Sequence, residues 1–235
     1  MFVLLILVVV YAPTSEGQQS PLACRAECKA GFQSDDCPPC PSTCLSGAGL
    51  VYSNHGPLQI ADLVLLNYST KILTLSINGT LAWSDVTFHL HPWNNHETIG
   101  LRLRVKKHFY VDVTLEHQVF TCNCYNGTIV RSSIPADRVT KHSCLVLPGK
   151  HNYECVAVES VLPTPIVGLY SPITAEGTIV VNGIGVSCYS YLEHSEAHEK
   201  FKRVHLLSVK QRQQLQQTLH KMSGEEFQGI LEQFL

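Results

Sequence analysis

Short apolar runs alternate with turn-forming residues through the middle of the chain. From about residue 49 to residue 191, runs rich in Val, Ile, Leu, Thr and aromatic residues are separated by Gly, Pro, Asn and Ser. Asn-Gly pairs, which favour tight turns between strands, begin at Asn78, Asn126 and Asn182. Many short strands at this spacing predict an all-β domain and not a succession of βαβ units.

The pattern changes after Tyr191, where Glu, Lys, Gln and Leu become dominant and proline disappears. Two sets of apolar residues then recur at helical spacing: Leu215, Leu219 and Met222, followed by Phe227, Ile230, Leu231, Phe234 and Leu235. Ser223 and Glu226 fit a capping box at the start of the second helix. We therefore expect a two-helix tail, whose apolar face either folds back on the β domain or contacts a membrane surface or lipid.

The N-terminus has the features of a secretory signal peptide. An apolar run ends at Ala12 and a polar stretch follows, and the run is too short to span a membrane. Cleavage is expected before Gln18. Sequons for N-glycosylation begin at Asn67, Asn78 and Asn126. These features predict a secreted, extracellular glycoprotein that is processed in the endoplasmic reticulum.

The ten cysteines are unevenly distributed, and in an oxidising compartment they are expected to form disulfides. Half of them crowd one short segment: Cys24, Cys28, Cys37, Cys40 and Cys44. The first four are expected to pair among themselves, in one of three arrangements, which leaves Cys44 free. The spacing of Cys37 and Cys40 also suits zinc or a redox motif, but a structural disulfide is favoured in a secreted chain and no second ligand pair is nearby, so we expect no metal and no other cofactor.

Size and charge limit the class of protein further. The length of 235 residues and the hydrophobic share of 45% predict one globular domain with short appendages. The net charge of -2 argues against nucleic acid as a partner. We expect a monomer.

The stretch from Val113 to Thr121 reads as a strand, yet it carries Thr114 and His117 three residues apart. Taken alone, this pair is typical of a hydrogen-bonded core histidine beside a threonine that favours strands. Its interpretation depends on motifs elsewhere in the chain.

Those motifs occur in a fixed order. Cys44-Leu45-x-Gly47 opens the β domain, Thr114-x-x-His117 lies in its middle, Val146-Leu147-Pro148-Gly149 follows, and Tyr170-x-Pro-x-Thr-x-x-Gly-Thr with Ser187-Cys188-Tyr189 closes it. This order resembles the autoprocessing domain of hedgehog proteins, the Hint fold that is shared with inteins, over residues 44 to about 205. The resemblance implies an all-β Hint fold with a short helical C-terminal tail. It divides the chain into a signal peptide (1–17), a Cys-rich segment (18–43), a Hint domain (44–192) and a helical tail (193–235).

The resemblance also implies a first chemical step. The Cys44 thiolate would attack the carbonyl carbon of Thr43 and convert the peptide bond into a thioester, an N-to-S acyl shift. Thr114 would hold the peptide by hydrogen bonding, and His117 would act as the general acid at the departing nitrogen. For Cys188 two interpretations stay open: support of Cys44 or redox pairing with it, or a small buried apolar residue.

The second step in hedgehog proteins transfers the acyl group to the hydroxyl of cholesterol with the help of an Asp. Counted from Ser84-Asp85, that position holds His91 here, and a neutral imidazole can also accept a hydroxyl proton. The neighbouring His89 leaves the register open, and a solvated or hydrogen-bonded histidine is the alternative. A β-branched Thr43 stands where hedgehog proteins have Gly and should slow the first step. Water, a sterol or another lipid remain as acceptors.

Three function classes remain open. The leading one is a protein that cuts itself once and releases residues 18–43. The second is a non-catalytic secreted binding protein that has kept the Hint fold, which the departures at Thr43 and His91 favour. The third is a disulfide-rich peptide precursor whose β domain serves folding. Intein-type splicing is not expected, because Leu235 is not the Asn of a splice junction.

Overall fold

The computed structural model describes residues 44–66, 70–76, 78–89, 93–106, 109–125, 129–149, 151–190, 194–201 and 206–219. The chain divides into two units, Met1–Cys40 and Pro41–Leu235, and all described residues belong to the second. The Cys-rich segment and the cysteine pairing expected within it therefore lie outside the described residues.

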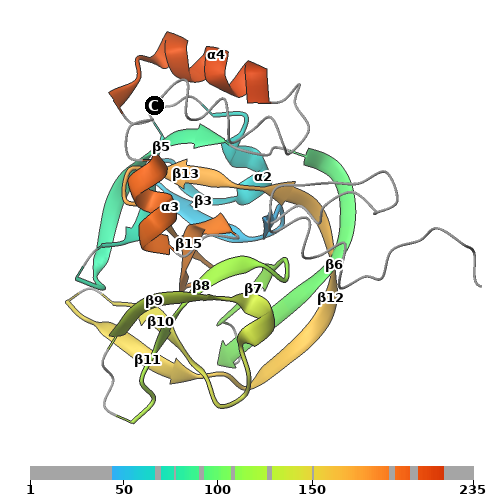
Figure 1. Cartoon of the computed structure of the whole chain (residues 1–235), viewed down its shortest axis with the longest axis vertical. Coiled ribbons are helices and arrows are strands. Elements are labelled where there is room, and N and C mark those ends of the chain that lie inside the picture. Colours follow the sequence, from blue (N-terminus) through green and yellow to red (C-terminus); the bar gives the residue numbers. More distant parts are fainter. Residues whose placement is uncertain are drawn as a thin grey trace, which may run out of the picture. The chain divides into compact units, whose positions relative to one another are not determined.

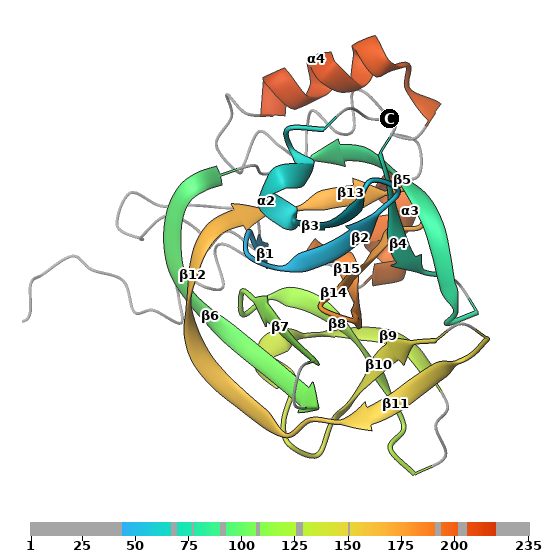
Figure 2. The ribbon, with the colours of Figure 1, turned by 180° about the vertical axis from the view of Figure 1, so that it is seen from behind.

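A closed barrel holds the start of the domain, with strands in the order β1-β12-β6-β7. The bounds are Leu45–Ser46 for β1, Ser160–Tyr170 for β12, Trp93–Lys106 for β6 and Phe109–Val113 for β7. β6 and β12 pair along most of their length and form two long curved arms that lie side by side (Figures 1 and 2). Leu45 pairs with Tyr170 on one side and Val113 on the other, so β1 is held between β12 and β7.

Two further sheets complete the β domain. One has the order β11-β10-β8-β15-β14 with β9 also paired to β8, and the other has the order β13-β5-β4-β2-β3. The bounds in the first are Tyr153–Ala157 (β11), Cys144–Pro148 (β10), His117–Cys122 (β8), Ile184–Ser190 (β15), Thr178–Val181 (β14) and Ile129–Pro135 (β9). Those in the second are Pro172–Thr174 (β13), Leu81–His89 (β5), Lys71–Leu75 (β4), Leu50–Ser53 (β2) and Gly56–Gln59 (β3). The predicted all-β class is confirmed.

The depth of each strand follows from its sequence. β8, β14 and β15 are buried at almost every residue. β14 and β15 consist mainly of apolar and small residues, as expected for buried strands, whereas β8 also buries the polar side chains of His117 and Gln118. β2 instead alternates between exposed and buried residues, as expected for a strand with one solvated face. The segments that carry His117 and Cys188 therefore lie in the interior.

Helices are few in the described part of the chain. They are α2 (Ile60–Leu63), the 3-10 turn η1 (Ala136–Arg138), α3 (His194–Phe201) and α4 (Val209–Leu219). The first predicted tail helix corresponds to α4, whereas α3 was not separately expected, because the apolar spacing that marks α4 is missing from its sequence. The predicted second helix, from Ser223 onward, lies outside the described residues.

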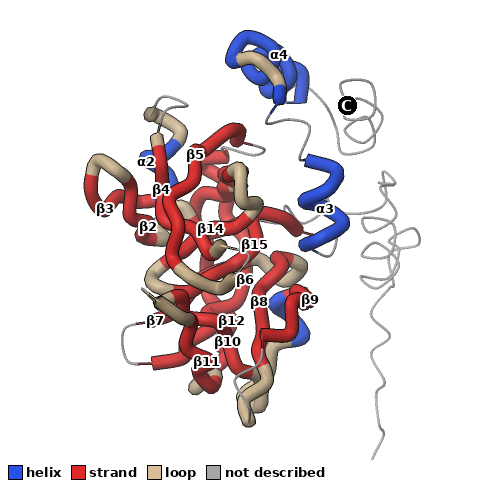
Figure 3. The backbone as a smooth tube through the Cα atoms, turned by 90° about the vertical axis from the view of Figure 1, so that its left-hand side faces the viewer, coloured by secondary structure: helices blue, strands red, loops and turns tan. Residues whose placement is uncertain are grey.

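The tail contacts the β domain at two places. α3 follows closely on β15 and contacts it (Figure 3). In α4, Leu215 is fully buried, and Arg212 Nη1 donates a hydrogen bond to the carbonyl oxygen of Thr87 in β5 at 3.3 Å. For this helix the structure therefore shows the folded-back arrangement. Among the described residues, no helix has the length and apolar character needed to cross a membrane.

Leu215→Ala should lower the free energy of unfolding by about 2 kcal/mol or more, because it removes fully buried apolar surface and leaves a cavity. Urea denaturation followed by circular dichroism would measure the change. Leu206→Ala is the matched control, since Leu206 is 85% exposed and its truncation should have little effect. Equal effects of the two substitutions would show that α4 is not packed on the β domain.

Candidate active site

Cys44 is fully buried directly before the two-residue strand β1. Its thiol is not part of a disulfide and packs with Ile166 and Leu169 of β12. Burial raises the pKa of the Cys44 thiol far above its usual value, because the thiolate would lose its hydration. The resting residue is therefore a neutral thiol.

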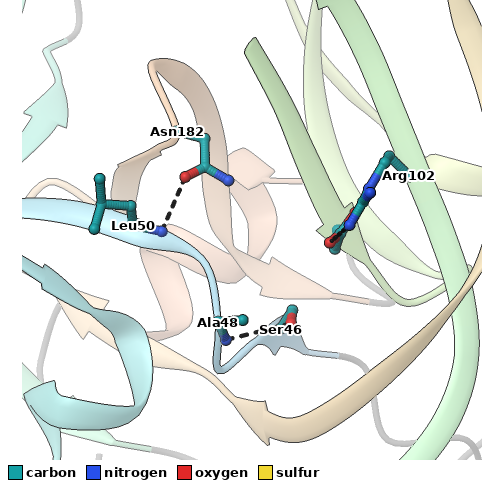
Figure 4. A network of polar contacts seen from close by, with 6 residues as sticks. Ser46, Ala48, Leu50, Arg102 and Asn182 are labelled. Carbon is teal, nitrogen blue, oxygen red and sulfur yellow. Dashed lines mark hydrogen bonds and ion pairs between the residues drawn. The ribbon is translucent and has the colours of Figure 1, made fainter. Parts of the chain in front are cut away.

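The residues after Cys44 turn sharply onto β2. A Cβ atom at Gly47 would collide with the Tyr170 ring at 2.5 Å, which explains why the third residue after Cys44 is glycine. Figure 4 shows the next contacts: the Ala48 nitrogen donates to Ser46 Oγ at 3.4 Å, and the Leu50 nitrogen donates to Asn182 Oδ1 at 3.0 Å. The backbone on the C-terminal side of Cys44 is thus fixed by several independent bonds.

Thr114 is in direct contact with the backbone of Cys44. The Cys44 nitrogen donates a hydrogen bond to Thr114 Oγ1 at 2.8 Å. The Cys44 carbonyl oxygen accepts two more, from the Thr114 nitrogen at 3.1 Å and from Thr114 Oγ1 at 3.3 Å. The structure therefore brings together two of the predicted site residues, and it places the hydroxyl on the nitrogen of the Thr43–Cys44 peptide bond.

Thr114 lies in a turn and not in a strand. The pattern predicted one strand from Val113 to Thr121, but β7 ends at Val113 and β8 begins at His117. The His117 nitrogen donates to the Thr114 carbonyl oxygen at 3.2 Å, and Asp137 of η1 donates its nitrogen to the Leu115 carbonyl oxygen at 2.9 Å. These bonds satisfy the polar backbone of the turn, so it can be formed inside the protein.

His117 is fully buried, and both nitrogens of its ring are hydrogen-bonded to β15. Nε2 lies 2.9 Å from the Ser187 carbonyl oxygen, and Nδ1 lies 3.0 Å from Ser190 Oγ. Because a carbonyl oxygen can only accept, Nε2 carries the proton and Nδ1 accepts from the Ser190 hydroxyl. Burial lowers the pKa of His117 to about 4, partly opposed by the Ser187 carbonyl, so the ring is neutral at pH 7.

A bulge in β15 produces this arrangement. Val186 pairs with Val119 and Ser190 pairs with His117, with a register shift between the two pairs. The four-residue step on β15 matches a two-residue step on β8, so Ser187 to Tyr189 leave the regular ladder with β8, while Ser187 still pairs with Thr178 of β14. The Ser187 carbonyl oxygen can then point at the imidazole instead of at a neighbouring strand.

Cys188 lies within this bulge and is also a free, fully buried thiol. Its sulfur lies 3.7 Å from Thr174 Oγ1, and burial raises its pKa to about 12, partly opposed by hydrogen bonds from Thr174. Cys188 belongs to the main apolar core, whereas Cys44 packs in a separate small cluster. In the structure the two thiols are not joined, and Cys188 is a small buried residue beside Thr174.

His91 and Thr43 lie outside the described residues, as do the sequons at Asn67 and Asn126, while Asn78 is exposed. The neighbours of His91 are described. His89 pairs with Pro172, and burial lowers its pKa to about 4. On the following strand Trp93 pairs with Leu169. The partners of His89 and Trp93 therefore lie on either side of Tyr170 in the sequence, and Tyr170 pairs with Leu45.

Three residues that the sequence motifs did not single out complete the surroundings of His117. Ser190 bonds to Nδ1, and His194 bonds through its own Nδ1 to the hydroxyl of Ser187 at 3.0 Å. Ser171 Oγ donates to the Cys188 carbonyl oxygen at 3.0 Å. For His194 the sequence carried one signal, its i, i+4 spacing from His198.

Two disulfides brace the strand that begins with His117. Cys122–Cys155 links β8 to β11, and Cys124–Cys144 links the residues after β8 to β10. Both lie at the far end of β8 from His117, so the strand is fixed at that end by covalent bonds. Disulfides of this kind suit an oxidising compartment.

The closed β fold, with a buried cysteine at its start and a threonine bonded to that cysteine's nitrogen, defines a domain of the autoprocessing type. Residues 40–230 match the family described as the Hint module, and the chain belongs to this family. The expected Hint fold and the resemblance to hedgehog proteins are thereby confirmed.

Relatives and solved structures agree with this assignment. The chain is 30% identical to Indian hedgehog B protein of Danio rerio over 187 residues, which are 70% of this chain and 42% of that protein. It is 26% identical to Sonic hedgehog protein of Xenopus laevis over 189 residues (75% and 38%) and 28% identical to Protein qua-1 of Caenorhabditis elegans over 171 residues (67% and 14%). The chain thus spans less than half of these relatives.

The fold itself is similar to that of a DnaB intein from Synechocystis. The TM-score is 0.52 at 17% identity, and the match covers 62% of this chain and 98% of the intein. At this identity the similarity concerns the fold alone.

The two buried, neutral histidines predict a loss of stability in acid. Because the folded pKa of His117 and of His89 is about 4 and the unfolded value is near 6.5, stability is complete above pH 6.5 and falls as the pH drops toward 4. Each ring should account for about 3 kcal/mol by pH 4. Urea denaturation between pH 7 and pH 4.5 would measure this loss.

His117→Gln should remove about half of that pH dependence, because one of the two imidazoles is then absent. His55→Gln is the control, since His55 is exposed in the turn between β2 and β3. If the His117→Gln protein loses stability in acid as steeply as the wild type, the buried neutral state of His117 is wrong.

Proposed function

We propose that this chain cleaves itself once, at the Thr43–Cys44 peptide bond, through an N-to-S acyl shift at Cys44. The observation that carries the proposal is the 2.8 Å hydrogen bond from the Cys44 nitrogen to Thr114 Oγ1, because that nitrogen is the leaving atom of the reaction. Membership of the Hint family supports it. Thr114 holds the peptide group, and His117 lies at the other end of the same turn.

The first step rearranges bonds without a co-reactant. The Cys44 sulfur adds to the Thr43 carbonyl carbon, the bond from that carbon to the Cys44 nitrogen breaks, and the thiol proton ends on the nitrogen. The thiol and the His117 ring are both neutral at rest, so the site holds no preformed thiolate or imidazolium and the thiol proton has to be moved during the reaction. His117 Nδ1 must exchange the Ser190 hydroxyl for the reacting groups before it can carry the proton.

The second step resolves the thioester with water or with the hydroxyl of a sterol or another lipid. His91 is the proposed general base for this hydroxyl, with His89 as the alternative. The described sequence neighbours of His91 support this choice: His89 pairs with Pro172 and Trp93 with Leu169, and Tyr170, which lies between these two partners in the sequence, pairs with Leu45. A buried His89 is neutral at pH 7, which is the form that accepts a proton.

The released piece would be residues 18–43, and the retained piece would comprise the Hint domain (44–192) and the tail (193–235). Hedgehog relatives and the two disulfides support secretion, with residues 1–17 as the signal peptide. A membrane contact would involve the apolar residues from Phe227 onward, because Leu215 of α4 is already buried against the β domain.

One observation favours a second candidate, a Hint domain that binds a partner without cutting. Both ring nitrogens of His117 are engaged by β15, and the resting contacts include none from this ring to Cys44. Together with the crowded Thr43 carbonyl, this arrangement suits a domain that stays intact. The mass of the secreted chain separates the two candidates.

The purified chain should be cut between Thr43 and Cys44 when hydroxylamine or a thiol intercepts the thioester, as measured by mass spectrometry. Cys44→Ala should abolish this cut, and His117→Ala should slow it by about 100-fold or more, the usual contribution of a general acid. Thr114→Val keeps the shape of the side chain but removes the hydroxyl that bonds the leaving nitrogen, and it should also slow the cut.

His142→Ala, which alters an exposed histidine, should leave the rate unchanged. An intact wild-type chain under these conditions would favour the binding protein. A cut that persists in Cys44→Ala, or one at another position, would refute the proposed chemistry.

Lipid transfer is tested with sterol-containing vesicles and the full chain. The N-terminal fragment should gain the mass of one sterol less one water relative to its free acid, and His91→Ala should suppress this gain more than it suppresses thiol-induced cutting. Truncation after Leu219 keeps all of α4 and should leave thiol-induced cutting intact while it abolishes lipid transfer. A fragment that carries only a free carboxylate would leave water as the acceptor.

A further inference from the structure

We propose that His194, the first residue of α3, is a positioning residue for His117 and acts through Ser187. The proposal rests on the proposed self-cleavage at Cys44, and it extends the site from the β domain into the tail. Ser187 is fully buried and is the residue that both histidines contact.

Ser187 uses its two oxygen atoms for two different histidines. Its carbonyl oxygen accepts the bond from His117 Nε2 at 2.9 Å. Its hydroxyl oxygen lies 3.0 Å from His194 Nδ1 and also accepts a bond from the Tyr189 nitrogen at 3.0 Å. The Ser187 hydroxyl is therefore held by two contacts, and His194 supplies one of these contacts.

The bulge makes this contact important. In a regular strand the ladder bonds set the direction of each carbonyl, but Ser187 to Tyr189 are out of register with β8. On the other side Ser187 pairs with Thr178 of β14, and the Cys188 nitrogen donates to the Gly177 carbonyl oxygen at 2.9 Å. On the β8 side the side-chain contacts of Ser187 take the place of the regular ladder and hold its carbonyl toward His117. Because that carbonyl selects the tautomer of His117, a contact that orients Ser187 also determines which ring nitrogen of His117 is free to accept a proton.

His194 is itself fixed to the strand that carries His117. Its backbone nitrogen donates to Ser133 Oγ at 2.9 Å, and Ser133 Oγ donates to Gln118 Oε1 at 2.8 Å, one residue after His117. Its ring meets Phe120 of β8 edge-on, with 4.8 Å between ring centroids. His194 therefore contacts both β8, which carries His117, and β15, which forms the hydrogen bonds to the His117 ring.

The rest of α3 packs on β15 and on the turn before β14. Tyr189 Oη lies 3.1 Å from His198 Nδ1, and the rings of His198 and His194 are stacked, with centroids 5.7 Å apart. A Cβ atom at Gly177 would collide with His198 Nδ1, which shows how closely the helix approaches the turn before β14. This anchoring allows α3 to hold His194 in one position.

A double-mutant cycle with the full chain tests the route through Ser187. His194→Ala and Ser187→Ala should each slow thiol-induced cleavage about fivefold, the effect of one ordinary hydrogen bond. The double variant should be no slower than the slower of the two single variants, because both remove the same contact. His194→Asn, whose amide can replace Nδ1, should restore most of the rate.

Circular dichroism and thermal unfolding verify that each variant is folded, and His55→Ala is the control for an exposed histidine. Wild-type rates in His194→Ala would overturn the proposal, and so would independent effects that multiply in the double variant.

A second measurement does not depend on cleavage. In the Cys44→Ala protein, which cannot react, nitrogen chemical shifts of His117 report its tautomer. We expect the Nε2-protonated form, and we expect His194→Ala to populate the Nδ1-protonated form as well. An unchanged tautomer in His194→Ala would refute the positioning role even if the wild type did not cut itself. Failure of self-cleavage with a changed tautomer would instead refute the proposed function alone.

Discussion

The hydrogen bond from the Cys44 nitrogen to the Thr114 hydroxyl is the contact on which the candidate site depends. It joins residues 70 positions apart in the sequence, and the two return bonds to the Cys44 carbonyl oxygen close a small cycle around it. The pairing of β1 with β12 and β7 already fixes this strand. Thr114 adds the chemical specificity, because it contacts the one nitrogen whose bond is proposed to break.

The site is built from buried groups that carry no charge. Burial raises the pKa of the Cys44 and Cys188 thiols and lowers the pKa of His117 and His89. In such a buried site a separated pair of charges is costly, which favours proton transfer that is coupled to bond formation. The hydrogen bonds from β15 to His117 then matter more than its average basicity, since they decide which ring nitrogen carries the proton.

Local pattern was sufficient for part of this picture. The alternation of short apolar runs with turns predicted the all-β class, which is confirmed. The resemblance carried by the ordered motifs predicted one site for Cys44, Thr114 and His117, and the structure joins the first two by hydrogen bonds. The turn at Thr114 was missed because one of the bonds that support it comes from Asp137, a residue distant in sequence whose nitrogen donates to the Leu115 carbonyl oxygen.

The roles of Ser187 and His194 were hidden for a similar reason, since they depend on a register shift between β8 and β15 that no local pattern encodes. The disulfides show the same limit. Cys122 lies opposite Cys144 in the sheet, yet it is bonded to Cys155.

The long sequence separations within the site also set an order of events during synthesis. Cys44 meets Thr114 across 70 residues, and His117 meets Ser187 across 70 more. Contacts this distant can form only after most of the chain has been synthesised. Sheets built from such contacts also fold slowly. Under the proposed reaction, the cut at Cys44 would therefore report that folding is complete. A misfolded copy would keep its N-terminal segment attached, and release of that segment would act as a checkpoint on the quality of the fold.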